Sequence, residues 1–129
     1  MKLEIDETKV NSLNKEELKE HLSLVEKSVR QLNEHAYNVM ERIFALEVAE
    51  TEAKWPVKEG EKVKVTYKSW SNSDNVMVGF FSRFGRPETY AWEKHSVFCV
   101  IRLAKKDGSM GKRTDQVLAS KIKSIEPCE

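Results

Sequence analysis

The chain has 129 residues, enough for one ordinary domain or for a long helix and one small domain, but not for two full globular domains. No stretch approaches the ~20 apolar residues that span a bilayer, and the charged start lacks the apolar core of a signal peptide. The chain has only two cysteines, Cys99 and Cys128, so we do not expect a secreted protein stabilised by several disulfides. We predict a soluble cytoplasmic protein without a membrane segment.

The charge is divided unevenly at Trp55. Residues 1–54 hold 8 Lys and Arg against 12 Asp and Glu (net −4), whereas residues 55–129 hold 14 against 9 (net +5). All five glycines and all three prolines also lie beyond residue 55. We therefore predict two parts, a tail and helix over 1–54 and a small β module over 55–129. The positive balance of the second part indicates an anionic partner.

A single long helix is predicted for the first part. Asn14 followed by Glu17 is typical of a capping box, which satisfies free backbone N–H groups at a helix start. The Trp55-Pro56 step disfavours helix just before the proline, so the helix should run from residue 15 to about residue 53. Its length of roughly 57 Å is far greater than the face of a 70-residue domain.

The apolar residues of this helix are spaced alternately by 4 and 3, as in a coiled coil. The alternative is an amphipathic helix lying on its own domain, but the helix is too long for that domain to cover. We expect the helix to associate with a second copy of the chain, most simply as a dimer, with parallel and antiparallel arrangements both open. The predicted oligomerisation residues are Leu18, Leu22, Val25, Val29, Leu32, Ala36, Val39, Ile43 and Leu46.

A second apolar edge lies off this seam, at Tyr37, Met40, Phe44 and Val48. The simplest cover for it is the β module that follows, folded back at Trp55-Pro56. A groove for an outside partner is the alternative.

From residue 61 the apolar period changes to the alternation typical of strands. Strands are predicted over 62–68, 76–84, 89–92 and 95–104, and residues 116–125 are predicted to form a strand, a short turn and a closing strand before Pro127. Gly79 indicates a bulge or bend within the second strand. The predicted core residues of this module are Val63, Val65, Val97, Ile101 and Ile122. The fold class is therefore α+β, a long N-terminal coiled-coil helix followed by a small antiparallel barrel of five to six strands.

This layout resembles the SH3-like barrels in its lysine-flanked strand over 62–68, its Asp107-Gly108 hairpin and its tight turn over 119–122. The resemblance implies a binding module, and it leaves the ligand open because such barrels bind peptides, nucleic acids and chromatin tails. The acidic, aromatic-rich loop of the SH3 domains that bind proline-rich peptides is missing, so polyproline binding is not expected.

No catalytic constellation is found. His95 and Cys99 share strand parity but would lie ~13 Å apart, too far for proton transfer. Cys99 is instead expected to be a packed core thiol. His21 and His35 have no companion ligands at metal-binding spacing, so no metal site and no cofactor are predicted. We do not expect an enzyme.

Two functions fit this sequence. The first is an oligomeric adaptor or assembly protein whose β module binds a segment of a partner protein. The second is an accessory or regulatory protein that binds nucleic acid through basic and stacking side chains. The candidate ligand-binding residues are aromatic or basic and lie in predicted turns or next to them: Trp70, Arg83, Phe84, Arg86, Tyr90, Trp92, Lys105, Lys106, Lys112 and Arg113. In the alternative, the aromatic residues among them close the barrel ends and pack on Tyr37 and Phe44.

Overall fold

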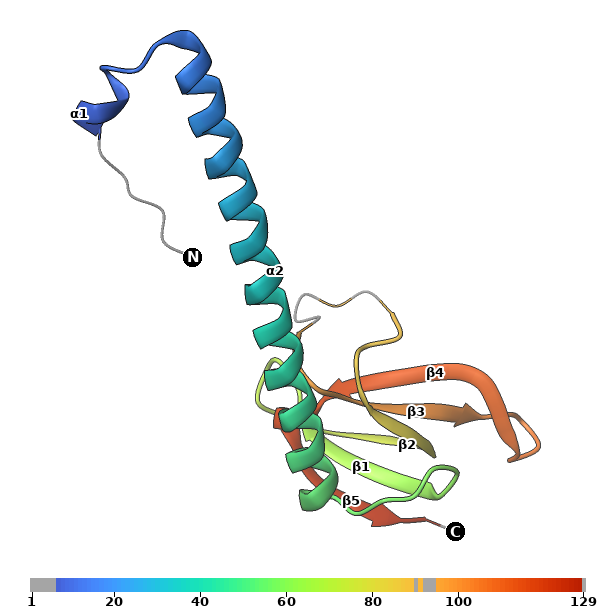
Figure 1. Ribbon diagram of the computed structural model, residues 1–129. Helices are drawn as coiled ribbons and strands as arrows, with labels where there is room; N and C mark the ends of the chain where they lie inside the picture. The colour runs from blue at the N-terminus through green and yellow to red at the C-terminus, as the bar shows by residue number, and fades with distance from the viewer. Residues whose placement is uncertain (1–6, 90, 92–94, 129) are drawn as a thin grey trace. The chain divides into compact units, whose positions relative to one another are not determined.

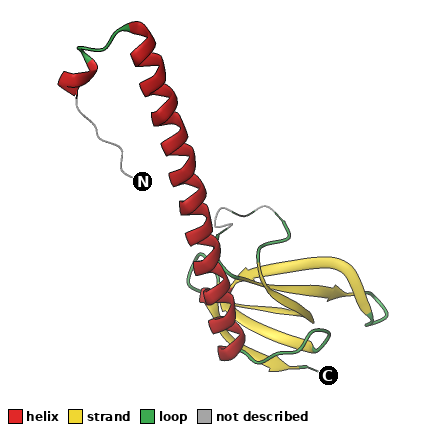
Figure 2. Ribbon diagram, in the orientation of Figure 1, coloured by secondary structure: helices red, strands yellow, loops and turns green. Residues whose placement is uncertain are grey.

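The computed structural model describes residues 7–89, 91 and 95–128, and its elements follow the α+β order predicted from the sequence (Figure 1). Two α-helices precede five strands, with one short 3₁₀ helix before the last strand (Figure 2). The elements in chain order are α1 (Glu7–Val10), α2 (Lys15–Lys54), β1 (Lys62–Lys68), β2 (Asp74–Gly85), β3 (Phe98–Ala104), β4 (Met110–Leu118), η1 (Ala119–Lys121) and β5 (Ile122–Pro127).

Helix α2 begins with the predicted capping box. The Asn14 Oδ1 atom accepts a hydrogen bond from the Glu17 N–H at 2.9 Å, and Glu17 Oε1 accepts one from the Asn14 N–H at 3.2 Å. The helix ends at Lys54, one residue later than predicted and two residues before Pro56. No helix in the described ranges is long and apolar enough to cross a membrane.

The chain divides into two compact units, Met1–Arg42 and Ile43–Glu129, and α2 contributes to both. In the first unit the predicted seam faces solvent in the single chain, with Leu22, Val29 and Leu32 between 50% and 68% exposed. Coiled-coil pairing is therefore not part of this structure and stays a prediction.

The second unit combines the last turns of α2 with the sheet. Phe44 and Val48 are partly buried and pack against the hydrophobic core of the sheet. The prediction that the β module covers the second apolar edge is confirmed for these two residues. Tyr37 and Met40, which belong to the first unit, remain exposed.

The five strands form one antiparallel sheet in the order β4-β3-β2-β1-β5. Strands β4 and β5 are its two edges, so the described strands form an open sheet and not the closed barrel predicted from the sequence. The predicted strand over 89–92 includes Tyr90 and Trp92, which lie outside the described residues. Strand β4 starts at Met110, six residues before its predicted start at Gln116. The polar segment over 110–115 belongs to the strand because it pairs with β3.

The core of the sheet contains all five residues predicted for it, namely Val63, Val65, Val97, Ile101 and Ile122. The other buried members are Met77, Phe81, Phe84, Cys99 and Val117. Close packing of these apolar side chains, which come from every strand, therefore stabilises the β module.

Gly79 does not form the predicted bulge. It pairs in register with Val63, and the irregularity of β2 falls between Phe81 and Arg83. A Cβ atom on Gly79 would lie 2.5 Å from the backbone oxygen of Arg102, so a side chain is excluded by the neighbouring strand β3.

Candidate functional site

The loop between β1 and β2, residues 69–73, folds onto itself. Its backbone is closed by hydrogen bonds from the Ser69 N–H to the Ser73 oxygen (2.9 Å) and from the Asn72 N–H to the Ser69 oxygen (3.0 Å). The hydroxyl oxygens of Ser69, Ser71 and Ser73 lie 2.9 to 3.0 Å from one another. Asn72 adopts φ = 60°, a left-handed conformation that asparagine tolerates better than most residues. The loop is therefore held by its own polar groups.

Trp70 lies in this loop and is 99% exposed. A large aromatic side chain normally buries most of its surface, so Trp70 is a candidate contact residue. Of the two described aromatic residues predicted to bind a ligand, Trp70 is exposed and Phe84 is buried.

A cleft of about 530 Å³ opens beside Trp70. This volume lies within the usual range of ligand sites. Its aromatic lining residues are Tyr67, Trp70 and Phe98. The described residues that line it are Tyr67, Lys68, Ser69, Trp70, Asn75, Ala91, Phe98, Gln116, Val117, Leu118 and Lys121.

The charge of the cleft is positive. Lys68 and Lys121 line it, and no carboxylate of the residues that the structure describes lies within ion-pairing distance of either ammonium group. Asp74, at the start of β2, is paired with Lys123, whose Nζ atom lies 2.9 Å from its Oδ2 atom. The described lining contains two lysines and no acidic residue.

Gln116 links the cleft to the β2–β3 loop. Its Oε1 atom accepts hydrogen bonds from the backbone N–H groups of Glu88 (2.8 Å) and Thr89 (3.2 Å). Its Nε2 atom donates to the Thr89 oxygen at 3.2 Å. The side chain thus holds the loop that leads to Ala91, another lining residue.

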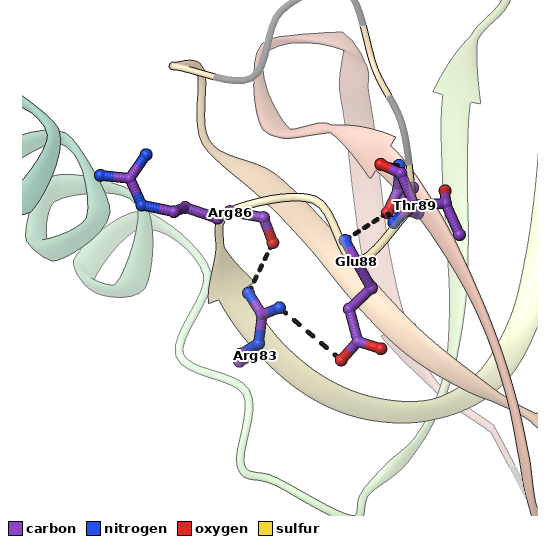
Figure 3. A network of polar contacts seen from close by, with 5 residues as sticks. Arg83, Arg86, Glu88 and Thr89 are labelled. Carbon is purple, nitrogen blue, oxygen red and sulfur yellow. Dashed lines mark hydrogen bonds and ion pairs between the residues drawn. The ribbon is translucent and has the colours of Figure 1, made fainter.

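Arg83 and Arg86 support the same loop from its other side (Figure 3). Arg83 Nη1 donates to the Arg86 oxygen at 2.7 Å, and Nη2 lies 3.6 Å from Glu88 Oε1. The Arg86 guanidinium carbon lies 4.6 Å from the centre of the Phe44 ring, a cation–π contact to the end of α2. Both arginines therefore already have structural contacts within the second unit.

The other binding candidates that the structure describes do not line the cleft. Phe84 is only 7% exposed and belongs to the core, where its ring centre lies 5.0 Å from that of Phe81. Lys105 and Lys106 lie in the β3–β4 hairpin turn, and Lys112 and Arg113 are exposed on β4 after it. Tyr90 and Trp92 lie outside the residues that the structure describes.

Sequence reasoning missed several lining residues. Lys68 was interpreted as part of a solvated strand face, and Lys121 as part of a turn. Asn75 and Gln116 gave no signal, because an isolated amide in a polar segment is typical of any surface. Their common position becomes visible only in the folded sheet, where all four line one cleft.

Cys99 belongs to the buried core of the sheet and is not among the described residues that line the cleft. Burial raises the pKa of the Cys99 thiol from its ordinary value of 9.0 to about 12, so the reactive thiolate is scarce at neutral pH. Among the residues whose placement is described, no cluster of His, Cys, Asp and Glu could hold a metal ion.

The sequence matches no protein-family model, no curated protein and no solved structure.

Proposed function

We propose that this protein is a non-enzymatic adaptor whose β module captures a segment of a partner protein in the cleft beside Trp70. The observation that carries the proposal is the 99% exposed Trp70 next to an aromatic-lined cleft of about 530 Å³. An aromatic side chain held ready on a closed loop supplies contact area at a small loss of conformational entropy, as in other protein-binding sites.

The β module is proposed to be an SH3-like barrel that stays open between β4 and β5. This proposal is supported by the position of β1 between β2 and β5, and by the 3₁₀ turn η1 directly before β5. The irregularity between Phe81 and Arg83 gives β2 a point at which to bend, since bulges increase local strand curvature. With this bend, β2 pairs with β1 through its first part and with β3 through its second.

Self-association through α2 is the second element of the proposal. It is supported by the unbroken apolar seam and by the exposure of Leu22, Val29 and Leu32 in the single chain. A dimer presents two clefts, so a partner with two binding segments is held by avidity.

The alternative is nucleic-acid binding, which is favoured by one observation. Trp70 could stack on a base while Lys68 and Lys121 contact phosphates. The basic candidates of the β3–β4 hairpin and of β4 after it, however, lie about six residues or roughly 20 Å along β3 from Phe98, and Arg83 and Arg86 are held in contacts with the β2–β3 loop and Phe44. They do not extend the cleft into a continuous basic track.

A display experiment tests these functions. Immobilised full-length protein and its Trp70→Ala variant are screened in parallel against a random peptide library and against labelled single- and double-stranded oligonucleotides at two salt concentrations. Peptides enriched by the native protein and not by the variant support the adaptor function. Oligonucleotide binding with a steep salt dependence and the same loss in the variant supports the alternative instead.

A further inference from the structure

The charges of the cleft select among protein ligands. Lys68 at the end of β1 and Lys121 in η1 both line it, and in the described part of the chain neither has a carboxylate partner. Asp74, the acidic residue at the start of β2, forms an ion pair with Lys123. Both ammonium groups can therefore pair with a negatively charged ligand that enters the cleft.

This arrangement disfavours cationic ligands. Aromatic faces attract ammonium and methylammonium groups, and an aromatic cleft alone would fit a lysine-rich or methyl-lysine segment. Two lysines in the walls reverse that preference, because like charges at close range raise the free energy of the complex. A segment with negative charge instead gains charge-assisted hydrogen bonds from both.

The Asn75 amide adds a polar group to the lining of the cleft. Its donor and acceptor groups match the N–H and C=O groups of a peptide main chain. The Gln116 amide, also in the lining, already bonds to the backbone of Glu88 and Thr89 and keeps the β2–β3 loop beside the cleft.

We infer that the ligand is an acidic peptide segment, with an aromatic or large aliphatic side chain that packs against Trp70 and with flanking carboxylates that meet Lys68 and Lys121. The inference rests on the proposed function of the cleft and specifies its ligand class.

Peptide arrays test this class directly. Peptides of about ten residues, roughly 33 Å when extended, carry a fixed central aromatic or leucine residue. Their flanking positions are drawn at random from Asp and Glu, from Asn and Gln, or from Lys and Arg. The best peptide of each array is labelled and titrated by fluorescence anisotropy against the full-length protein, with oligothymidylate as the nucleic-acid probe. We expect the acidic peptide to bind roughly tenfold more tightly than the amide peptide.

Matched variants locate the effect. Lys68→Gln combined with Lys121→Gln should weaken acidic-peptide binding roughly tenfold and abolish the preference over the amide peptide. Lys105→Gln combined with Lys106→Gln removes the same charge from the β3–β4 hairpin and should leave binding within about twofold, since exposed charges at that distance are screened. Thermal melting of both double variants shows that each is folded.

The outcomes separate the inference from the proposed function. Tighter binding of the amide or basic peptide, lost in Trp70→Ala, overturns the acidic class while the peptide-binding function stands. Equal weakening by the two double variants also overturns it. Trp70-dependent binding of oligothymidylate alone, or no binding from any array, overturns both.

Discussion

The side-chain amide of Gln116 and the backbone of Thr89 form a reciprocal pair of hydrogen bonds, both 3.2 Å long. A third bond, from the Glu88 N–H to Gln116 Oε1, measures 2.8 Å. One side chain on strand β4 thus satisfies three backbone groups of the β2–β3 loop, and it is itself a lining residue of the cleft.

Removal of this amide should loosen the loop. Gln116→Ala deletes three hydrogen bonds, each with a net value of about 0.5–1.5 kcal/mol, and part of that value is recovered by water at this exposed site. We expect a loss of about 1–2 kcal/mol in the free energy of unfolding. Hydrogen exchange at the Glu88 and Thr89 amides should accelerate well beyond the global change. Lys112→Ala, an exposed position on the same strand, is the control. Unchanged exchange at Glu88 and Thr89 would show that other contacts hold the loop.

The two cysteines should differ in reactivity. With a pKa near 12, Cys99 is protonated at pH 8, and its side chain is fully buried. Titration with a thiol reagent at pH 8 should modify Cys128, which is only half-buried, and reach Cys99 after denaturation. Rapid modification of Cys99 in the folded protein would contradict its burial.

The same shift predicts a dependence of stability on pH. Because the folded-state pKa of Cys99 is raised above 9.0, its contribution is complete below pH 9 and is lost as the pH rises toward about 12. The Cys99→Ala variant lacks this group. The difference in unfolding free energy between native and variant protein should therefore shrink over that range and be constant from pH 6 to 8. A constant difference throughout would exclude the linkage.

Substitution of Gly79 should be more damaging than substitution of Gly85. An alanine Cβ at position 79 would meet the Arg102 oxygen at 2.5 Å, and β3 would have to move. At position 85 the nearest atom is Arg83 Nη1 at 2.8 Å, the end of a flexible side chain. We expect Gly79→Ala to lose about 1–3 kcal/mol and Gly85→Ala less than about 1 kcal/mol in urea unfolding. Equal losses would mean that the strands tolerate the extra atom.

Charge in the α2 seam should dissociate the proposed oligomer without unfolding the β module. Val29→Asp combined with Leu32→Asp places carboxylates at side chains that are 50% and 68% exposed in the single chain. They are tolerated in a monomer and cost several kcal/mol when a second helix buries them. Light scattering should report an oligomer for the native protein and a monomer for the variant, with unchanged near-UV dichroism. Lys27→Asp with Gln31→Asp, off the seam, is the control. A monomeric native protein would exclude the coiled coil.

The point of truncation tests where the β module begins. Phe44 and Val48 pack on the core, so a fragment that starts at Ile43 keeps them and one that starts at Trp55 does not. Half-burial of two large apolar side chains contributes about 2–3 kcal/mol. The fragment over 55–129 should therefore unfold at lower urea concentration than the fragment over 43–129. Coincident unfolding curves would place the boundary at residue 55.

Elements with strong local signals could be predicted from the sequence. The capping box at Asn14 and Glu17, the alternation of Val63 and Val65 and the apolar β3 each depend on nearby residues, and the structure confirms them. The first half of β4 could not be predicted, because its residues become a strand only through pairing with β3. The same holds for the cleft. Trp70 could be singled out from the sequence because it is an aromatic residue in a polar turn. Lys68, Gln116 and Lys121 come together in the cleft lining only in the folded chain.

The self-closed loop over 69–73 separates the side chain at position 70 from the stability of the fold. Trp70 buries almost no surface in the single chain, and the loop closes through its own backbone and serine hydroxyls. Exchange of this one side chain for a smaller, longer or charged one is therefore expected to leave the core untouched. Under the proposed function, substitutions at position 70 can change the ligand without destabilising the protein, and the loop is a suitable place to engineer new specificity.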